Sequence, residues 1–527
     1  MQEYTVKGQL KLTDRQTLIA KASYYEEDSN ISETGLGEID YAKDKFQAPT
    51  GNNDRFEHER KTMQLQHVFQ FDNTAKLSTQ AYYADSQRSS FRQTDAPGRF
   101  DENNDSTGIT EIERCPVSNE ATEANAETCG GRHRPRSYQY YGFEPHLDFQ
   151  HNLFGIQSDA VVGFRLHNED IKRRQFRGNT AAFQSRSFAK ANAQSREDIR
   201  IDVDAKSYYA QNTFYVSDWA ITPGVRIEDV KIKTDVKRAD GEVQNNPESK
   251  LTNNQTEVLP GLGLAWNGIA NTTFFAGVHK GFAPPRPDRD LSVPECNGAG
   301  NDTDNCAIVD KTKPETSINW EIGVRSSYFK GVSFESTLFH TQVDDIVINN
   351  GNGAFINGGE SEQTGLEFGG RVDFGTIYNT PHNIYLQGSY TNVFTAEFNK
   401  DGLNAGDGII KGDRLPHAPR HIASVSLGYQ HPVGLNARVG VDYVSRQQAD
   451  TFARVLEPVD AGLSGLAGDI PAYTLLNMSV NFKPVGSKAT YFMSGYNLAD
   501  KEYLASRVDG MAVGRGRQVT AGIRYDF

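Results

Sequence analysis

Long stretches of this chain of 527 residues alternate apolar and polar residues with a period of two. The pattern is clearest in four segments, 63–71, 423–429, 437–443 and 476–482. Because successive side chains of a β-strand point to opposite faces, each segment is predicted to be a strand with one apolar and one polar face. The predicted strands are about ten residues or longer, which is the length of a tilted strand that spans a bilayer. The pattern therefore indicates an all-β protein.

Alternation alone does not distinguish a membrane barrel from a soluble β-sandwich, whose polar face meets water. Pairs of tyrosines near the ends of predicted strands favour the barrel, because aromatic girdles mark both interfaces of membrane barrels. These pairs are Tyr24-Tyr25, Tyr82-Tyr83, Tyr140-Tyr141 and Tyr208-Tyr209. The sequence contains no apolar run long enough for a transmembrane helix.

The predicted connections between strands alternate between short and long. Short turns are expected at 13–14, 72–74, 217–218, 267–268, 330–331 and 483–488. Long polar loops are expected at 27–58, 91–137, 170–204, 230–255, 283–316, 349–360, 396–420, 446–470 and 499–515. Outer-membrane barrels have this asymmetry, with short periplasmic turns and long extracellular loops.

The pattern predicts about nineteen strands, counted back from the carboxyl end. A closed bacterial barrel of one chain has an even number of strands. An open edge in lipid would leave unpaired backbone groups, each costing several kcal/mol. We therefore expect either one overlooked strand or, as the favoured interpretation, about three strands that precede Met1 in a complete barrel.

The four cysteines form two close pairs in polar loops, Cys115 with Cys129 and Cys296 with Cys306. Two disulfides that close these loops are expected in an oxidising compartment. Closing a loop of roughly 15 residues contributes on the order of 3 kcal/mol to stability. A metal site is the weaker alternative, because the chain has neither a Cys-x-x-Cys pair nor histidines at matching spacing.

The net charge of −13 disfavours a nucleic-acid partner, because no basic excess is present to neutralise phosphates. We find no phosphate-binding loop, dinucleotide fingerprint, zinc-protease motif or nucleophile elbow, so no catalytic residues and no enzymatic activity are expected. The twelve histidines form no obvious cluster, and no metal site or resident cofactor is predicted.

The carboxyl end carries the most specific motif. The final alternating strand stops on Phe527, and a terminal strand of this kind resembles the signal read by the outer-membrane assembly machinery. The stretch 496–503, followed by Gly516-Arg517 and the last strand, resembles the closing signature of TonB-dependent receptors. Upstream, 279–285 and 313–325 are similar to a late strand, outer loop and returning strand of the same family.

This resemblance implies a transmembrane antiparallel β-barrel of the 22-stranded type, located in the bacterial outer membrane. Members of the family also carry an amino-terminal plug and a short segment that binds the energy-transducing protein TonB, and nothing in this sequence resembles either. No signal peptide is visible at Met1. Residues 1–527 are therefore expected to form the barrel domain, with the plug and the first strands missing.

The resemblance further implies uptake of a ferric chelate, with the iron carried as part of the ligand. The segments 142–146 and 173–178 look most like ferric-citrate-type receptors. Citrate chelates are anionic, and the arginine guanidinium matches a carboxylate. The candidate ligand-binding residues are Arg173, Arg174, Arg177, Arg286 and Arg289, chosen from loop arginines that also include Arg88, Arg92, Arg132, Arg134 and Arg136.

Other interpretations stay open for these arginines and for the whole chain. The alternative interpretation of each arginine is that it balances acidic neighbours or contacts lipopolysaccharide phosphates, as is usual for surface charge. A barrel without a plug would be a wide passive channel. A soluble β-rich adhesin would show the same alternation without entering a membrane.

Overall fold

The computed structural model describes most of the chain. The described residues are 1–30, 35–47, 54–93, 131–178, 194–239, 242–243, 250–285, 292–296, 306–349, 355–402, 409–449, 465, 468–508 and 510–526. None of the helices in these ranges is long and apolar enough to cross a bilayer.

Nineteen long strands and the two-residue strand β9 (Glu242–Val243) form one antiparallel sheet. The long strands are β1 (Gln2–Thr13), β2 (Gln16–Ser29), β3 (Arg55–Gln70), β4 (Ala75–Gln93), β5 (Gly131–Leu153), β6 (Ile156–Gly178), β7 (Gln194–Val216), β8 (Trp219–Ala239), β10 (Lys250–Ile269), β11 (Thr272–Ala283), β14 (Glu315–Ser326), β15 (Val332–Asn349), β16 (Phe355–Asp373), β17 (Asn383–Phe398), β18 (His421–His431), β19 (Leu435–Val444), β22 (Tyr473–Phe482), β23 (Ala489–Tyr496) and β26 (Gln518–Tyr525). The predicted number of strands is confirmed.

Small elements lie in the connections between the long strands. They are the pairs β12 (Ser292–Cys296) with β13 (Cys306–Lys311), β20 (Gln447–Gln448) with β21 (Asp469–Ile470) and β24 (Leu504–Ser506) with β25 (Ala512–Val513), and the helices α1 (Glu38–Lys43) and α2 (Phe374–Tyr378).

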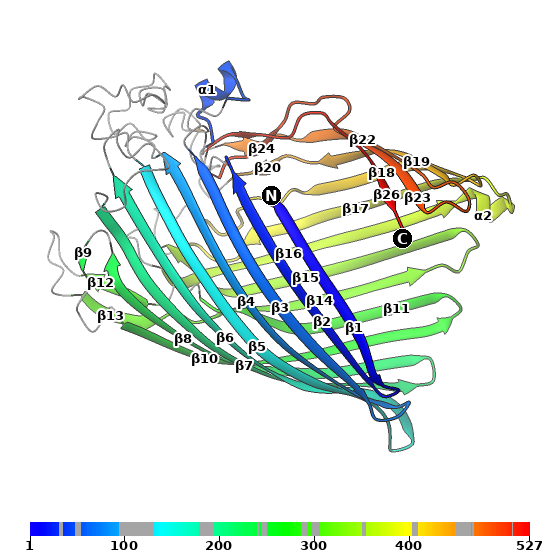
Figure 1. Cartoon of the computed structure of the whole chain (residues 1–527), viewed down its shortest axis with the longest axis horizontal. Helices are drawn as coiled ribbons and strands as arrows, with labels where there is room; N and C mark the ends of the chain where they lie inside the picture. The colour runs from blue at the N-terminus through cyan, green and yellow to red at the C-terminus, as the bar shows by residue number, and fades with distance from the viewer. Residues whose placement is uncertain are drawn as a thin grey trace.

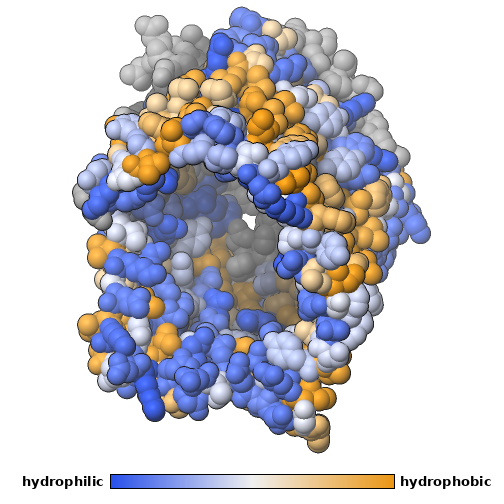
Figure 2. Space-filling model, turned by 90° about the vertical axis from the view of Figure 1, so that its right-hand side faces the viewer, coloured by the Kyte–Doolittle hydropathy of each residue, from blue (hydrophilic) through white to orange (hydrophobic). Residues whose placement is uncertain are grey.

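The sheet curls round on itself, with short turns at one end and long connections at the other (Figure 1). The space-filling view shows that it encloses a hollow (Figure 2). Each long strand pairs with the next long strand along the chain, so β1 and β26 are the two edges of the sheet. No described ladder joins these edges, and every residue of β1 is exposed. The sheet is therefore open along the seam between β1 and β26.

The two faces of the curled sheet differ in chemistry. Large apolar side chains are exposed on the outer face, where Met63, Ile322 and Leu427 are 66%, 59% and 51% exposed. The residues that alternate with them face the hollow, and Figure 2 shows that the wall of this hollow is mostly hydrophilic. An apolar outer band around a polar interior is the arrangement expected of a barrel in lipid.

Strands β5 to β8 are longer than a bilayer requires. They have 21 to 23 residues, whereas about 9–11 span the hydrocarbon core. Their outer face becomes charged toward the long-connection end, where opposite charges on β7 and β8 are register partners: Lys206 with Asp229, Asp204 with Lys231, Asp202 with Lys233 and Arg200 with Asp235. Such pairs stabilise a sheet by about 0.2–1 kcal/mol each, so the strands continue into water.

The predicted bounds of the long loops are wrong at this end. Residues 131–137, 170–178 and 194–204 were expected in loops, but they belong to β5, β6 and β7. Apolar and polar residues alternate only where one face meets lipid. Where both faces meet water the alternation is lost, although the backbone ladder continues.

Three connections at the long-connection end pack together. The buried side chain of Arg507 donates to Glu38 Oε1 at 2.5 Å and to the carbonyl of Asp469 at 3.0 Å. Leu36 and Met511 exchange two backbone hydrogen bonds of 2.8 and 2.7 Å. We call residues 36–43 and 504–513 the outer clasp, because they join regions close to the two edges of the sheet.

A charge placed on the outer face should destabilise the sheet in lipid, and the same charge in the lumen should not. Ile322→Lys is expected to lower the free energy of unfolding by about 2–4 kcal/mol. Glu321→Lys, one residue away on the lumen face, is the matched control. Urea unfolding of protein folded into phospholipid vesicles measures both, and equal unfolding midpoints would contradict the assignment of the two faces.

Candidate functional site

Six arginines of β4, β5 and β6 share the lumen face near the long-connection end of the sheet. They are Arg88, Arg92, Arg132, Arg134, Arg136 and Arg173, and we call them the arginine wall. Arg88, Arg136 and Arg173 are register partners in one row across three strands. Arg92 and Arg132 are register partners nearer the mouth. On each strand, the residues next to these arginines share a face with the exposed apolar residues of the outer band. Successive side chains alternate between faces, so the arginine side chains face the lumen.

Two arginines of the arginine wall have polar partners on neighbouring strands. Arg173 Nε lies 3.2 Å from Glu197 Oε2, which offsets one charge. Arg134 Nε donates to Gln175 Oε1 at 3.1 Å, a neutral partner. Arg136 Nε is buried and has no hydrogen-bond partner in the described part of the chain.

Like charges directly opposite each other destabilise a pair of strands. An anion in the lumen would relieve this repulsion, and the guanidinium fork is suited to bind carboxylates. The arginine wall therefore has the charge and the donors to bind a polyanionic ligand.

A polar and aromatic network lies below the arginine wall on the same strands. Tyr82 OH lies 2.8 Å from His167 Nδ1 and accepts from Arg165 Nε at 2.9 Å. His167 Nε2 lies 2.7 Å from Glu169 Oε1. Gly142 makes room for the ring of Tyr82, because a Cβ at this position would lie 2.3 Å from that ring. This network is internally satisfied, and we assign it a structural role in ordering the wall.

The structure separates the arginines that were predicted from sequence. Arg173 belongs to the arginine wall, whereas Arg174 is exposed and lies on the opposite face of β6. The backbone of Arg177 pairs with Arg132, but its side chain lies outside the described part of the structure. Arg286 and Arg289 lie outside the described residues. Closeness in sequence therefore did not predict which arginines lie together. The register of β4, β5 and β6 decides this.

The predicted disulfides are not tested. Cys115 and Cys129 lie outside the described residues. Cys296 and Cys306 are register partners on β12 and β13, although their side chains are not described. Phe527, the predicted assembly signal, also lies outside the described residues. In the described part of the chain, no group of three or more His, Cys, Asp or Glu is placed to hold a metal ion.

The motif near the carboxyl end forms a buried polar knot centred on Asn497. The Asn497 side chain donates to the carbonyls of Lys501 and Arg515 at 2.9 and 3.0 Å and accepts from the Lys501 amide at 2.8 Å. Its φ of 48° lies in the left-handed region, which asparagine tolerates well. Nearby, burial raises the pKa of the Tyr503 phenol, and a hydrogen bond with Tyr496 adds to this shift.

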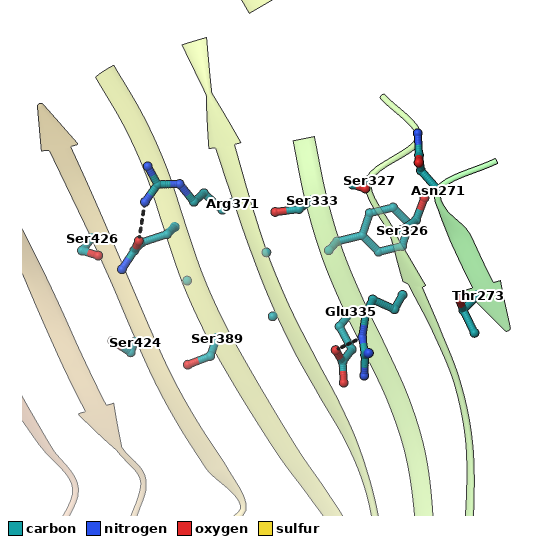
Figure 3. A pocket seen from close by; sticks show the side chains of 16 residues that line it. Asn271, Thr273, Ser326, Ser327, Ser333, Glu335, Arg371, Ser389, Ser424 and Ser426 are labelled. Carbon is teal, nitrogen blue, oxygen red and sulfur yellow. Dashed lines mark hydrogen bonds and ion pairs between the residues drawn. The ribbon is translucent and has the colours of Figure 1, made fainter. Parts of the chain in front are cut away.

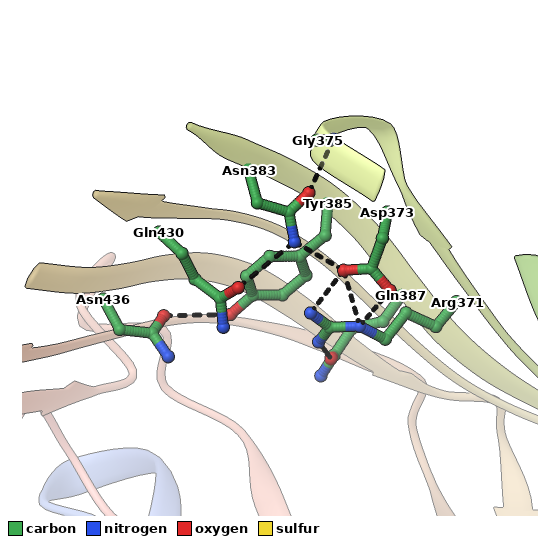
Figure 4. A network of polar contacts seen from close by, with 8 residues as sticks. All are labelled: Arg371, Asp373, Gly375, Asn383, Tyr385, Gln387, Gln430 and Asn436. Carbon is green, nitrogen blue, oxygen red and sulfur yellow. Dashed lines mark hydrogen bonds and ion pairs between the residues drawn. The ribbon is translucent and has the colours of Figure 1, made fainter. Parts of the chain in front are cut away.

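Small side chains line a second lumen surface at the short-turn end. Serines of β15, β17 and β18 border a hollow of about 630 Å³, where Arg325 Nε donates to Glu335 Oε2 at 2.8 Å (Figure 3). Beside it, the Arg371 guanidinium lies 3.8 Å from the centre of the Tyr385 ring and pairs with Asp373 at 2.7 Å (Figure 4). Because these charged groups are paired with each other, this surface has less capacity for an anion than the arginine wall.

Comparisons with known proteins agree with this architecture. The chain matches the family model described as TonB dependent receptor-like, beta-barrel over residues 5–498. It is 25% identical over 241 residues to the iron-regulated outer membrane virulence protein of Vibrio cholerae serotype O1, which covers 45% of this chain and 35% of that protein. It is also 25% identical over 225 residues to the ferrioxamine receptor of Yersinia enterocolitica, which covers 41% of this chain and 28% of that receptor. The chain thus covers about a third of these curated relatives.

A solved structure supports the fold. The ferric citrate transporter FecA in its unliganded form superposes with a TM-score of 0.73 at 20% identity, covering 99% of this chain and 69% of that one. At this identity the likeness concerns the fold alone.

Replacing the central side chain of the polar knot should loosen the outer end of the last strands. Asn497→Ala leaves two carbonyls and one amide without these partners, and the expected loss in the free energy of unfolding is about 2–4 kcal/mol. Asn152→Ala, at an exposed asparagine beside a short turn, is the control. Urea unfolding followed by tryptophan fluorescence measures both variants. An Asn497 variant as stable as the control would show that the knot does not stabilise the fold.

Proposed function

Because this chain belongs to the TonB-dependent receptor family, whose β-barrel it matches over nearly its whole length, we propose that it serves the TonB-energised uptake of a ferric chelate. The protein is located in the outer membrane, as its family membership requires. The printed names of its relatives, an iron-regulated outer membrane protein and a ferrioxamine receptor, support iron uptake. One relative is named for its regulation by iron and the other for ferrioxamine, so these names do not point to one particular chelate.

The proposed ligand is an anionic ferric chelate of the citrate type. The single observation that carries this proposal is the row of Arg88, Arg136 and Arg173 on the lumen face. A carboxylate-rich ligand accepts charge-assisted hydrogen bonds from such a row, whereas a cationic or neutral chelate would not relieve its repulsion. The likeness of the fold to the ferric citrate transporter is compatible with this choice.

A passive outer-membrane channel is the second candidate. The hydrophilic hollow seen from the short-turn end favours it (Figure 2). A large, ungated single-channel conductance in planar bilayers would support the channel. A small conductance together with high-affinity chelate binding would support the receptor. The soluble adhesin finds no support in a family of outer-membrane proteins.

Neutralising the arginine wall should weaken ferric citrate binding strongly. The double variant Arg88→Gln, Arg136→Gln removes two donors to the ligand, each contributing about 1.5–3 kcal/mol. The dissociation constant is expected to rise by at least about a hundredfold at fixed salt. Isothermal titration calorimetry on the purified protein in detergent measures the change.

The matched control is Lys172→Gln, Arg174→Gln, which removes the same charge from the opposite face of β6. This variant is expected to bind ferric citrate within about threefold of the unmodified protein, because exposed charges are screened. A second control is an uncharged ferric hydroxamate, whose binding should not respond to either double variant. Equal losses in both double variants would rule out the arginine wall as the ligand site.

A further inference from the structure

The outer face of the sheet carries a notch made by two neighbouring glycines. Gly370 of β16 and Gly388 of β17 are register partners. Phe334 of β15 and Val425 of β18 extend the same row on either side. On β15, Phe334 alternates with Ser333 and Glu335, so its side chain lies on the face opposite to theirs. Val425 is 47% exposed on the apolar outer band. We call this row the glycine notch.

Larger apolar side chains border the glycine notch on both sides. Phe368 and Tyr390 form one border, and Val372 and Leu386 form the other. The resulting groove has a volume of about 610 Å³. The polar residues that alternate with these, such as Arg371, point into the lumen hollow instead (Figure 3). The exposed lining of the groove is therefore almost entirely apolar.

The two glycines differ in how strictly the backbone requires them. A Cβ at Gly388 would lie 2.8 Å from the carbonyl oxygen of Ser424, so a side chain would force the strands apart. A Cβ at Gly370 would lie 3.3 Å from the far end of the Phe368 ring and 3.6 Å from the Ser333 carbonyl oxygen, which is an ordinary contact distance. The backbone thus tolerates a larger residue at position 370, and the absence of a side chain there leaves the groove open.

A cation lies in the short turn that precedes Val332 of the groove. Val332, which lines the groove, follows the turn that contains Lys330. The Lys330 ammonium donates to Asn379 Oδ1 at the end of α2, and an ammonium has two further donors. Phe329 and Tyr378 in the same two turns are 63% and 70% exposed, as expected of an aromatic girdle at the membrane interface.

We propose that the glycine notch is a binding site for one phospholipid of the inner leaflet. Its acyl chain lies between Phe334 and Val425 over the two glycines, and its phosphate contacts Lys330. The groove is continuous with the lipid-facing band, and Val332, one of its lining residues, is two residues from Lys330 of the short turn. This geometry matches one lipid molecule, with its apolar chain and its anionic phosphate. The site depends on membrane residence and is independent of the ligand that the lumen binds.

The test uses the protein extracted from outer membranes and exchanged into detergent, with phosphatidylglycerol as the probe. Native mass spectrometry counts retained lipid on four proteins: the unmodified chain, Gly370→Ile, Lys330→Gln and Ala276→Ile. Isoleucine at position 370 fills the notch, whereas Ala276 lies on the outer face away from it. One tightly retained lipid is expected on the unmodified protein and on Ala276→Ile. Gly370→Ile and Lys330→Gln should each weaken its retention by at least about tenfold, which corresponds to about 1.4 kcal/mol.

A second measurement keeps the proposal testable if Gly370→Ile does not fold. Phosphatidylglycerol with a photoreactive group on its acyl chain should label β15 to β18 of the unmodified protein more than β11 and β14. Uniform labelling, or equal lipid retention in all four proteins, would overturn the proposal. A dimer of the unmodified protein that Gly370→Ile dissociates would also overturn it, because a second copy would then occupy the notch.

Discussion

The bilayer has no water to satisfy backbone amides and carbonyls, and this constraint governs the rest of the structure. Each long strand pairs with its neighbours over most of its length, so the backbone polar groups between β2 and β23 are satisfied within the sheet. The apolar outer band, the short turns and the polar hollow follow from this solution. The seam between β1 and β26 is the one place where described long strands leave an edge without a ladder.

The pleat of the sheet places unlike functions on adjacent residues. Arg173 faces the lumen and Arg174 faces outward, so consecutive cations take part in different chemistry. Gly370 borders the lipid groove, while Arg371 joins a polar network in the lumen. The sheet is a single layer, so within a regular stretch of strand the odd or even position of a residue assigns it to lipid or to lumen.

Much of the fold was predictable from the sequence, because period-two alternation and turn length report directly on a sheet in lipid. The arginine wall was less accessible. Arg132, Arg134 and Arg136 were noted as loop arginines, but their strands continue beyond the membrane, where both faces are polar and the alternation disappears. Their meeting with Arg88 and Arg173 depends on the register of three strands, which hydrophobic pattern specifies only where one face is apolar. The glycine notch was not apparent either, because its four residues come from four different strands.

The outer clasp has a consequence for the order of assembly. Arg507 and Glu38 are separated by 469 residues, so their ion pair closes a loop that contains almost every strand. Contacts between neighbouring strands close much shorter loops and lose less chain entropy. The clasp is therefore expected to form last. Its buried arginine would then act as a kinetic checkpoint, since a sheet with one misregistered strand would not bring the two ends of the chain into contact.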